Sequence, residues 1–274
     1  MTSRRSFLRD GVVALPALHF ASLLAAQQTG NAQRPLDEMG QNTTQERTVY
    51  AAPDFGPVPL VLPAEALALH GAASLRAHAQ RHGLHMGAAI QPGSLSKDPA
   101  LAGLIAQQFN MLVSENSLKW VALRPAQDRY DFADADLMFA FAKQNGMQVR
   151  GHTLAWHNSV PQWMTEGAGT LDVRALFVDH ICTVVGRYRG RVHSWDVVNE
   201  AIYPEDKQPG GMRQSFWFQH VGPDYIELAF RTAHEADPHA RLCYNDYGVE
   251  YDTPDQDERR RLILELLQIG RAHV

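Results

Sequence analysis

Strand-like and helix-like segments alternate from residue 84 to residue 268, and this alternation restricts the fold more than any other feature of the sequence. Five short, mostly apolar runs are each followed by a longer segment with helical periodicity. This order and spacing predict βαβ units around a parallel sheet. The expected strands are residues 84–90, 110–114, 148–153, 191–199 and 241–245. The expected helices are residues 65–82, 99–108, 135–145, 171–188, 225–236 and 255–268.

Five such units fit two α/β architectures, a doubly wound open sheet or part of an eight-stranded barrel. A dinucleotide-binding doubly wound fold would carry a glycine-rich turn after its first strand. The sequence after Ile90 is Gln-Pro-Gly-Ser instead. This difference argues against a dinucleotide-binding fold.

The fourth expected strand ends in two polar residues, Asn199 and Glu200. In a parallel α/β barrel the carboxyl ends of the strands carry the chemistry. We therefore interpret Glu200 as a catalytic acid and Asn199 as a group that holds the substrate beside it. The alternative is a glutamate that caps a helix after a core strand. Asp196, inside the strand, requires a buried partner, either Arg150 or a histidine, because an unpaired buried carboxylate is costly.

Polar and aromatic residues follow four successive strands at the same end. They occupy residues 114–120, 151–157, 199–200 and 244–247. Aromatic rings suit the C–H faces of a sugar, and neighbouring amide, carboxylate and imidazole groups suit its hydroxyls. The recurrence of this combination predicts a carbohydrate site at the carboxyl end of the sheet.

The N-terminal segment has the pattern of an export signal. Arg4 and Arg5 precede a short apolar run, residues 12–24, which is too short for a spanning helix of about 20 residues. We predict a twin-arginine signal over residues 1–32 and a periplasmic or secreted protein; an uncleaved membrane anchor is the alternative. Residues 33–63 are rich in Gln, Asn, Thr and Pro, which predicts a flexible arm.

Charge and cysteine usage argue against nucleic-acid binding and against metal or redox chemistry at the cysteines. The formal charge is −5 without a basic patch, which argues against nucleic acid. Cys182 and Cys243 have no metal or redox spacing, and each lies in an apolar run that predicts a core position. A disulfide between them is left open, and no cofactor or metal is expected.

The motifs along residues 84–267 closely resemble those of the endo-β-1,4-xylanases of glycoside hydrolase family 10. The resemblance rests on Glu-Asn-Ser-Leu-Lys-Trp at 115–120, Gly-His-Thr-Leu-Ala-Trp-His at 151–157, Trp-Asp-Val-Val-Asn-Glu-Ala at 195–201 and Tyr-Asn-Asp-Tyr at 244–247. It implies a TIM (β/α)₈ barrel, of which residues 64–268 would form the first five βα units. It also implies hydrolysis of internal β-1,4-xylosidic bonds of xylan with retention.

The same resemblance implies roles for individual residues. Glu200 would be the general acid/base, and Asn199 would bind the 2-hydroxyl of the sugar at the cleavage point. The remaining substrate-binding residues implied by the resemblance are Glu115, Asn116, Lys119, His152 and Trp156, with Asn245 and Tyr247 as support around the acid/base. The expected partners are xylan and xylo-oligosaccharides, and the full-length protein is expected to be a monomer. His157 is open between a structural, hydrogen-bonded histidine and a substrate contact.

The family's nucleophilic glutamate comes from a seventh strand, which has no counterpart here. The last residues, 269–274, match the translation of a common sequencing adapter, so we interpret them as a non-native tail on a shortened sequence. Five units cannot close a barrel whose strand number and shear are linked. We therefore expect this chain alone to be unstable and inactive.

Other functions stay open from the sequence. The first alternative is a catalytically dead protein that binds xylo-oligosaccharides without cleaving them. A second is a metal-dependent hydrolase using His152, His157 and His193, although no HExxH-like spacing supports it. Within the enzyme interpretation, other β-glycans or short aryl xylosides are alternative substrates.

Overall fold

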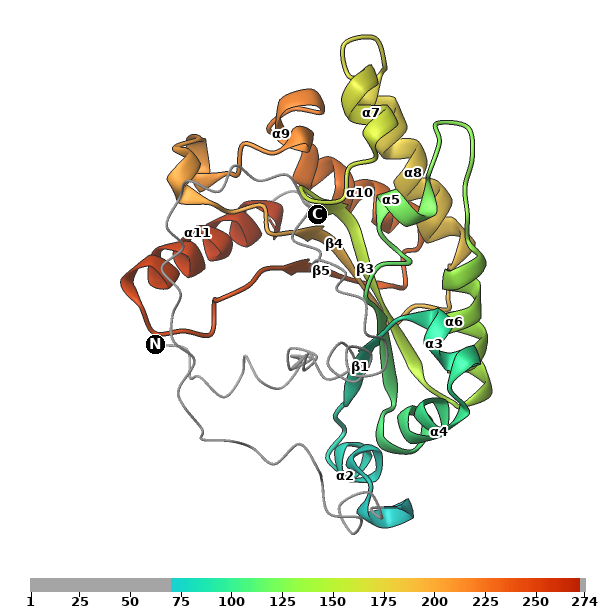
Figure 1. Ribbon diagram of the computed structural model, residues 1–274. Helices are drawn as coiled ribbons and strands as arrows, with labels where there is room; N and C mark the ends of the chain where they lie inside the picture. The colour runs from blue at the N-terminus through green and yellow to red at the C-terminus, as the bar shows by residue number, and fades with distance from the viewer. Residues whose placement is uncertain (1–69, 272–274) are drawn as a thin grey trace, which may run out of the picture.

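A computed structural model describes residues 70–271 and shows five parallel strands there in one curved sheet (Figure 1). The strands are β1 (Gly87–Ile90), β2 (Met111–Ser114), β3 (Gln148–Trp156), β4 (Ser194–Asn199) and β5 (Arg241–Asn245). Their order in the sheet is their order in the chain. A doubly wound sheet reverses direction at a switch point. The sequential order therefore selects the barrel arrangement over the doubly wound one, and the prediction of five βα units of a barrel is confirmed.

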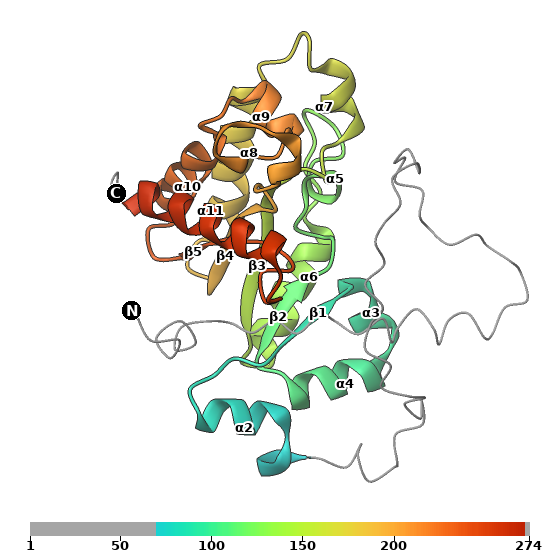
Figure 2. The ribbon, with the colours of Figure 1, turned by 90° about the vertical axis from the view of Figure 1, so that its left-hand side faces the viewer.

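The helices between the strands lie on the outer face of the sheet (Figures 1 and 2). The main ones are α4 (Pro99–Gln108), α6 (Ala133–Gln144), α8 (Val173–Arg187) and α10 (Tyr225–Ala236), whereas α2 (Leu75–Arg81) precedes β1 and α11 (Pro254–Arg271) follows β5. Local chemistry sets their starts: the carboxylates of Asp98 and Asp172 accept backbone N–H groups at the first turns of α4 and α8. Two helices, α4 and α10, have the predicted bounds, whereas α11 runs three residues beyond the predicted end at Gln268.

Short helices in the connections after the strands were not predicted. They are α3 (Pro92–Lys97), α5 (Trp120–Leu123), α7 (Gln162–Gly167) and α9 (Phe216–His220), with the 3₁₀ turns η2 (Gly71–Ala73), η3 (Pro204–Asp206) and η4 (Pro209–Gly211). Each spans one or two turns, which is too short to show helical periodicity. All but η2 follow a strand, so they shape the carboxyl rim of the sheet.

The centre of the sheet is fully buried. All six residues of β4 are buried, which explains its continuous apolar run. Gly151 on β3 faces Trp195 on β4, and a Cβ atom at Gly151 would overlap the indole ring. The glycine of the Gly-His-Thr motif is therefore a packing requirement. The pairing of β4 shifts register with β3 between His152 and Ala155, and with β5 beside Asp196.

The two cysteines are not a pair. Both are free; Cys243 is partly buried on β5, and Cys182 is exposed on α8. The prediction that Cys182 is a core residue is wrong, because it lies on the outer side of a helix whose other face packs inward.

The predicted signal (1–32) and arm (33–63) lie outside the described residues, as do residues 272–274. Within residues 70–271 no helix combines the length and apolar character that crossing a membrane requires.

The sheet has two open edges in its described part, since β1 pairs only with β2 and β5 only with β4. Unpaired strand edges template association with other chains. We expect the 274-residue chain, expressed alone, to elute as aggregate in size-exclusion chromatography and to lack a sharp thermal transition. A soluble monomer that melts cooperatively would contradict this expectation.

Candidate active site

Glu200 follows the last residue of β4 and has an unusual backbone. Its φ angle is 57°, a left-handed value that few non-glycine residues adopt. Two hydrogen bonds hold it there: its N–H donates to the Asn245 carbonyl at 2.9 Å, and its carbonyl accepts from Arg213 Nε at 2.8 Å. Strained residues that the surroundings fix in this way concentrate at functional sites.

The Glu200 carboxylate is held at both oxygens. Trp156 Nε1 donates to Oε2 at 3.0 Å, and Asn199 Nδ2 donates to Oε1 at 3.2 Å. The Nδ1 atom of His157 lies 3.9 Å from Oε2. The side chain is 19% exposed, so it is oriented by the protein and still reachable from solvent. A helix-capping role for Glu200 has no support in these contacts.

A chain of hydrogen bonds connects Glu200, through two asparagines, to a buried ion pair. Asn245 Nδ2 donates to Asn199 Oδ1 at 2.7 Å, and Arg150 donates to Asn245 Oδ1 at 3.1 Å. Arg150 in turn binds both carboxylate oxygens of Asp196, with its shortest contact at 2.6 Å. Asn199 Oδ1 and Asn245 Oδ1 thus each accept one hydrogen bond, and these bonds fix the orientation of the Asn199 amide.

Asp196 has both of the partners that the sequence suggested. Besides Arg150, His152 Nδ1 lies 2.9 Å from Asp196 Oδ2. The Asp196 side chain is 3% exposed and that of Arg150 is 11% exposed, so the ion pair is buried. The pair therefore orients two site residues, His152 directly and Asn245 through Arg150.

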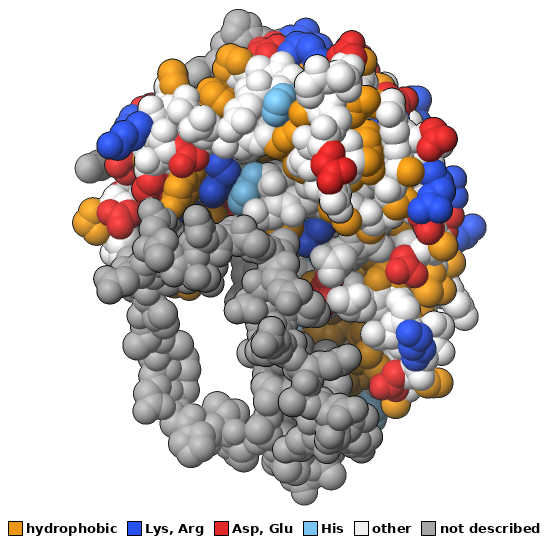
Figure 3. Space-filling view, turned by 45° about the horizontal axis from the view of Figure 1, so that its top comes forward, with side chains coloured by type: hydrophobic (Ala, Val, Ile, Leu, Met, Phe, Trp, Pro, Cys, Tyr) orange, Lys and Arg blue, Asp and Glu red, His pale blue; other side chains and the backbone are white. Residues whose placement is uncertain are grey.

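A second group of predicted residues follows β2, which pairs with β3 in the sheet. Lys119 Nζ donates to Asn116 Oδ1 at 3.1 Å and lies 4.6 Å from the centre of the Trp156 ring. Burial lowers the pKa of Lys119, and the charges of Glu115 and Glu200 partly oppose that shift. The side chains predicted from β2, β3 and β4 are thus neighbours. Figure 3, which brings this end of the molecule forward, shows basic, acidic and histidine side chains together between apolar ones.

Tyr247 lies apart from this group. It is 47% exposed, and the Arg259 guanidinium lies 4.6 Å from its ring centre. Its place as support for the acid/base stays a prediction. The residue that does contact the backbone after Glu200 is Tyr244, whose hydroxyl accepts from the N–H groups of Ala201 and Ile202 at 2.9 and 3.0 Å. Sequence reasoning missed Tyr244, because either tyrosine of the motif could have filled this position.

A model of glycosyl hydrolase family 10 matches residues 74–271. The chain belongs to glycosyl hydrolase family 10. It is 44% identical over 168 residues to a β-1,4-xylanase of Dictyoglomus thermophilum, a match that covers 61% of this chain and 46% of the relative.

Solved structures of family 10 members have the same architecture. The native xylanase 10B of Thermotoga maritima is 40% identical and superposes with a TM-score of 0.63. The xylanase 10B of Thermotoga petrophila RKU-1, solved in complex with xylobiose, is 39% identical with the same score. Each match covers 72% of this chain and 60% of the solved chain. This family 10 chain therefore spans about half to three fifths of the length of these relatives.

The hydrogen-bonded structural role considered for His157 has no support at its Nδ1 atom, and the substrate contact stays a prediction. The Nδ1 atom is buried and has no hydrogen-bond partner in the described part of the structure. Burial, followed by the charge of Arg213, lowers the pKa of His157 from 6.5 to about 4. The imidazole beside Glu200 is therefore neutral at ordinary pH.

This shift predicts a pH dependence of stability. The unfolded chain protonates His157 below about 6.5, whereas the folded protein does so only near 4, so the unfolded state binds more protons between these values. The stabilisation is complete above pH 6.5 and is lost as the pH falls toward 4, by about 3 kcal/mol at most. Urea titrations of the full-length protein at several pH values should show a flatter profile for His157→Gln. The exposed His234→Gln is the control, and equal profiles for both variants would contradict the prediction.

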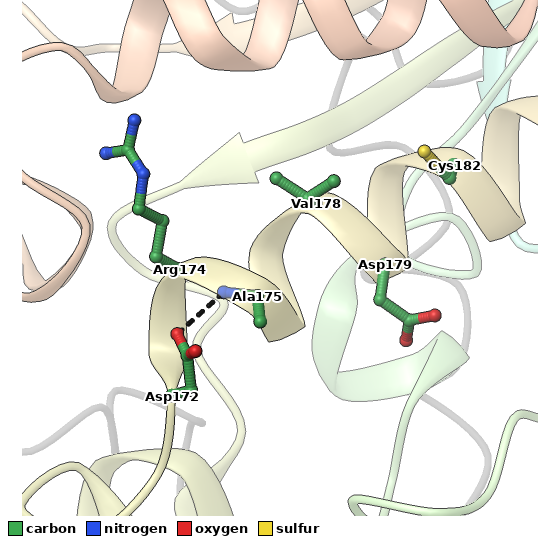
Figure 4. A pocket seen from close by; sticks show the side chains of 6 residues that line it. All are labelled: Asp172, Arg174, Ala175, Val178, Asp179 and Cys182. Carbon is green, nitrogen blue, oxygen red and sulfur yellow. Dashed lines mark hydrogen bonds between the residues drawn. The ribbon is translucent and has the colours of Figure 1, made fainter.

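A hollow on the outer surface is not part of this site. It is formed by one face of α8 (Figure 4), and its lining residues are Asp172, Arg174, Ala175, Val178, Asp179 and Cys182. The polar groups there have structural partners: Asp172 caps α8, and Arg174 pairs with Asp224 at 2.6 Å. Burial raises the pKa of the Cys182 thiol, with Glu235 and Asp179 adding to the effect.

Residues 70–271 contain no cluster of three or more His, Cys, Asp or Glu side chains arranged to hold a metal ion. His152, His157 and His193 thus do not converge. The metal-dependent alternative gains no support from their positions.

Proposed function

We propose that the full-length protein is a retaining endo-1,4-β-xylanase in which Glu200 is the general acid/base. The observation that carries this proposal is the Glu200 carboxyl group, fixed at the carboxyl end of β4 by Trp156 and Asn199 and partly open to solvent. General acid catalysis requires such a positioned, reachable proton donor. The xylanase names of the family 10 relatives supply the substrate class.

In the proposed reaction Glu200 first protonates the departing glycosidic oxygen, and its carboxylate then takes a proton from the attacking water. Asn199 Nδ2 uses one N–H on Glu200, which leaves the second N–H for the sugar 2-hydroxyl. Lys119 and Asn116, with Glu115 beside them, would bind the next sugar toward the non-reducing end. His152, oriented by Asp196, would line the cleavage subsite.

We further propose that the nucleophile comes from a strand outside these 274 residues. Retaining hydrolysis needs a second carboxylate roughly 5 Å from the first. The match to only 60% of the solved family 10 chains supports a longer protein. A DNA read across codon 268 to the stop codon tests this, together with the foreign origin of residues 269–274. Three further βα units, with a glutamate ending the seventh strand, would support the proposal, and a true stop after Val274 would favour the sugar-binding alternative.

The export signal at residues 1–32 stays part of the proposal. Its test is the N-terminal sequence of protein recovered from the periplasm or the medium. A mature chain beginning near residue 33 is expected, and full-length protein retained in the cytoplasm would contradict it.

The activity itself is tested with the full-length protein on soluble xylan. An endo-acting enzyme cuts internal bonds, so viscosity should fall early, while few reducing ends have formed. Release of xylose alone, or binding without turnover, would contradict the proposed activity.

A further inference from the structure

We propose that Asp246 is a positioning residue for Glu200 and acts through the hydroxyl of Tyr244. This inference rests on the proposed function and names a part of the site that binds no substrate. It starts from the backbone directly after Glu200, where the chain leaves β4 in a left-handed turn.

The Tyr244 hydroxyl caps this turn. It accepts from the N–H groups of both Ala201 and Ile202, at 2.9 and 3.0 Å. A phenol oxygen has two acceptor lone pairs and one proton. Both lone pairs are therefore occupied, and the proton must go to another acceptor.

Asp246 is that acceptor. Tyr244 donates to its Oδ2 atom at 2.6 Å, and the N–H of Tyr247 donates to its Oδ1 atom at 2.9 Å. The Asp246 side chain is only 2% exposed, and Arg259, 5% exposed, lies 3.9 Å from Oδ1. Burial, followed by Asp246, raises the pKa of Tyr244, so its hydroxyl keeps its proton. The carboxylate fixes the direction of that proton and thereby leaves both lone pairs facing the turn.

At the Tyr244 hydroxyl both lone pairs and the proton are engaged in hydrogen bonds. Asparagine at position 246 would have one oxygen for two donors, so either Tyr244 or the Tyr247 N–H would face an NH₂ group. Phenylalanine at position 244 would leave two backbone N–H groups without this acceptor. Either change loosens the turn that carries the Glu200 carboxyl, without touching the carboxyl itself.

A displaced general acid has a distinct kinetic signature. Xylosides with poor leaving groups need protonation of the departing oxygen, whereas dinitrophenyl xylosides leave without it. Displacement of Glu200 should therefore lower kcat/KM, which reports the first step, selectively for poor leaving groups, by up to about 10²-fold. On dinitrophenyl substrates kcat and KM should fall together, because water attack on the intermediate still needs Glu200 as base. A variant that only weakens the fold would affect all substrates alike.

The test compares Tyr244→Phe, Asp246→Asn and the double variant in the full-length protein. Matched controls are Tyr251→Phe and Asp252→Asn, because Tyr251 is 60% exposed and the Asp252 side chain 93% exposed. Two readouts are used: kcat and KM on phenyl and dinitrophenyl β-xylobiosides, and hydrogen exchange of the Ala201 and Ile202 amides.

We expect both single variants to lose amide protection at 201 and 202 and to lose kcat/KM mainly on the phenyl substrate. The double variant should resemble Tyr244→Phe, because Asp246 acts through the tyrosine. Preserved protection, or equal losses of kcat/KM on both substrates, would overturn the inference. If the parent protein cleaves neither substrate, the proposed function fails, and the amide exchange still decides whether the turn depends on Tyr244 and Asp246.

Discussion

Replacing Glu200 by glutamine in the full-length protein is expected to lower kcat on xylan by about 10²- to 10⁴-fold. Glutamine keeps the size of the side chain and can still accept from Trp156, which donates to Glu200 Oε2 at 3.0 Å. It has no proton to give to the departing oxygen and cannot take one from water. The loss should appear in kcat, with xylan binding retained, in initial rates of reducing-sugar release.

The matched control is Glu235→Gln, an exposed glutamate on the outer helix α10. Its activity should equal that of the parent protein, since α10 lies outside the sheet. A Glu200→Gln enzyme with more than about a tenth of the parent rate would contradict general acid/base catalysis by Glu200.

Replacing Arg150 by methionine should destabilise the full-length protein by about 3–5 kcal/mol. The Asp196 side chain is only 3% exposed. The change leaves its carboxylate without the guanidinium that binds both of its oxygens. It also removes the donor that holds Asn245, and through it Asn199. Urea unfolding should therefore show a lower midpoint with an unchanged slope, accompanied by a fall in activity.

Arg231→Met supplies the comparison for this prediction. Arg231 pairs with Glu227 on the surface of α10, where both side chains are more than half exposed. Exposed pairs contribute about 0–1 kcal/mol, so this variant should unfold nearly like the parent protein. Similar losses for Arg150→Met and Arg231→Met would show that the buried pair has no special role.

The sequence predicted the order of the five strands and of the long helices, and it did so most directly where the burial pattern is pronounced, whereas the starts of β1, β4 and α2 were each placed three or more residues too early. β4 is buried on both faces and reads as a continuous apolar run, and α10 carries its apolar residues on one side. The one-turn helices α5 and α9 were missed because four or five residues carry no measurable period. The open choice between a doubly wound sheet and a barrel depends on strand order, which no local pattern encodes.

The site was predicted in its residue types and less well in its connections. Asn199, Trp156 and Glu200 were expected near one another, and the structure joins them by hydrogen bonds. The left-handed backbone of Glu200 and the contact of Tyr244 with the following turn depend on three-dimensional geometry alone. The sequence motif contains two tyrosines, and only the fold distinguishes the one that contacts the turn.

Chemical rescue of a Glu200→Ala variant tests the central claim most directly. With a dinitrophenyl xylobioside the first step needs no acid, so the enzyme should stall before water attacks the covalent intermediate. Added azide needs no general base, and it should restore turnover and give the β-configured xylobiosyl azide. An α-configured azide would identify Glu200 as the nucleophile instead, and full turnover without azide would show that Glu200 is not the acid/base.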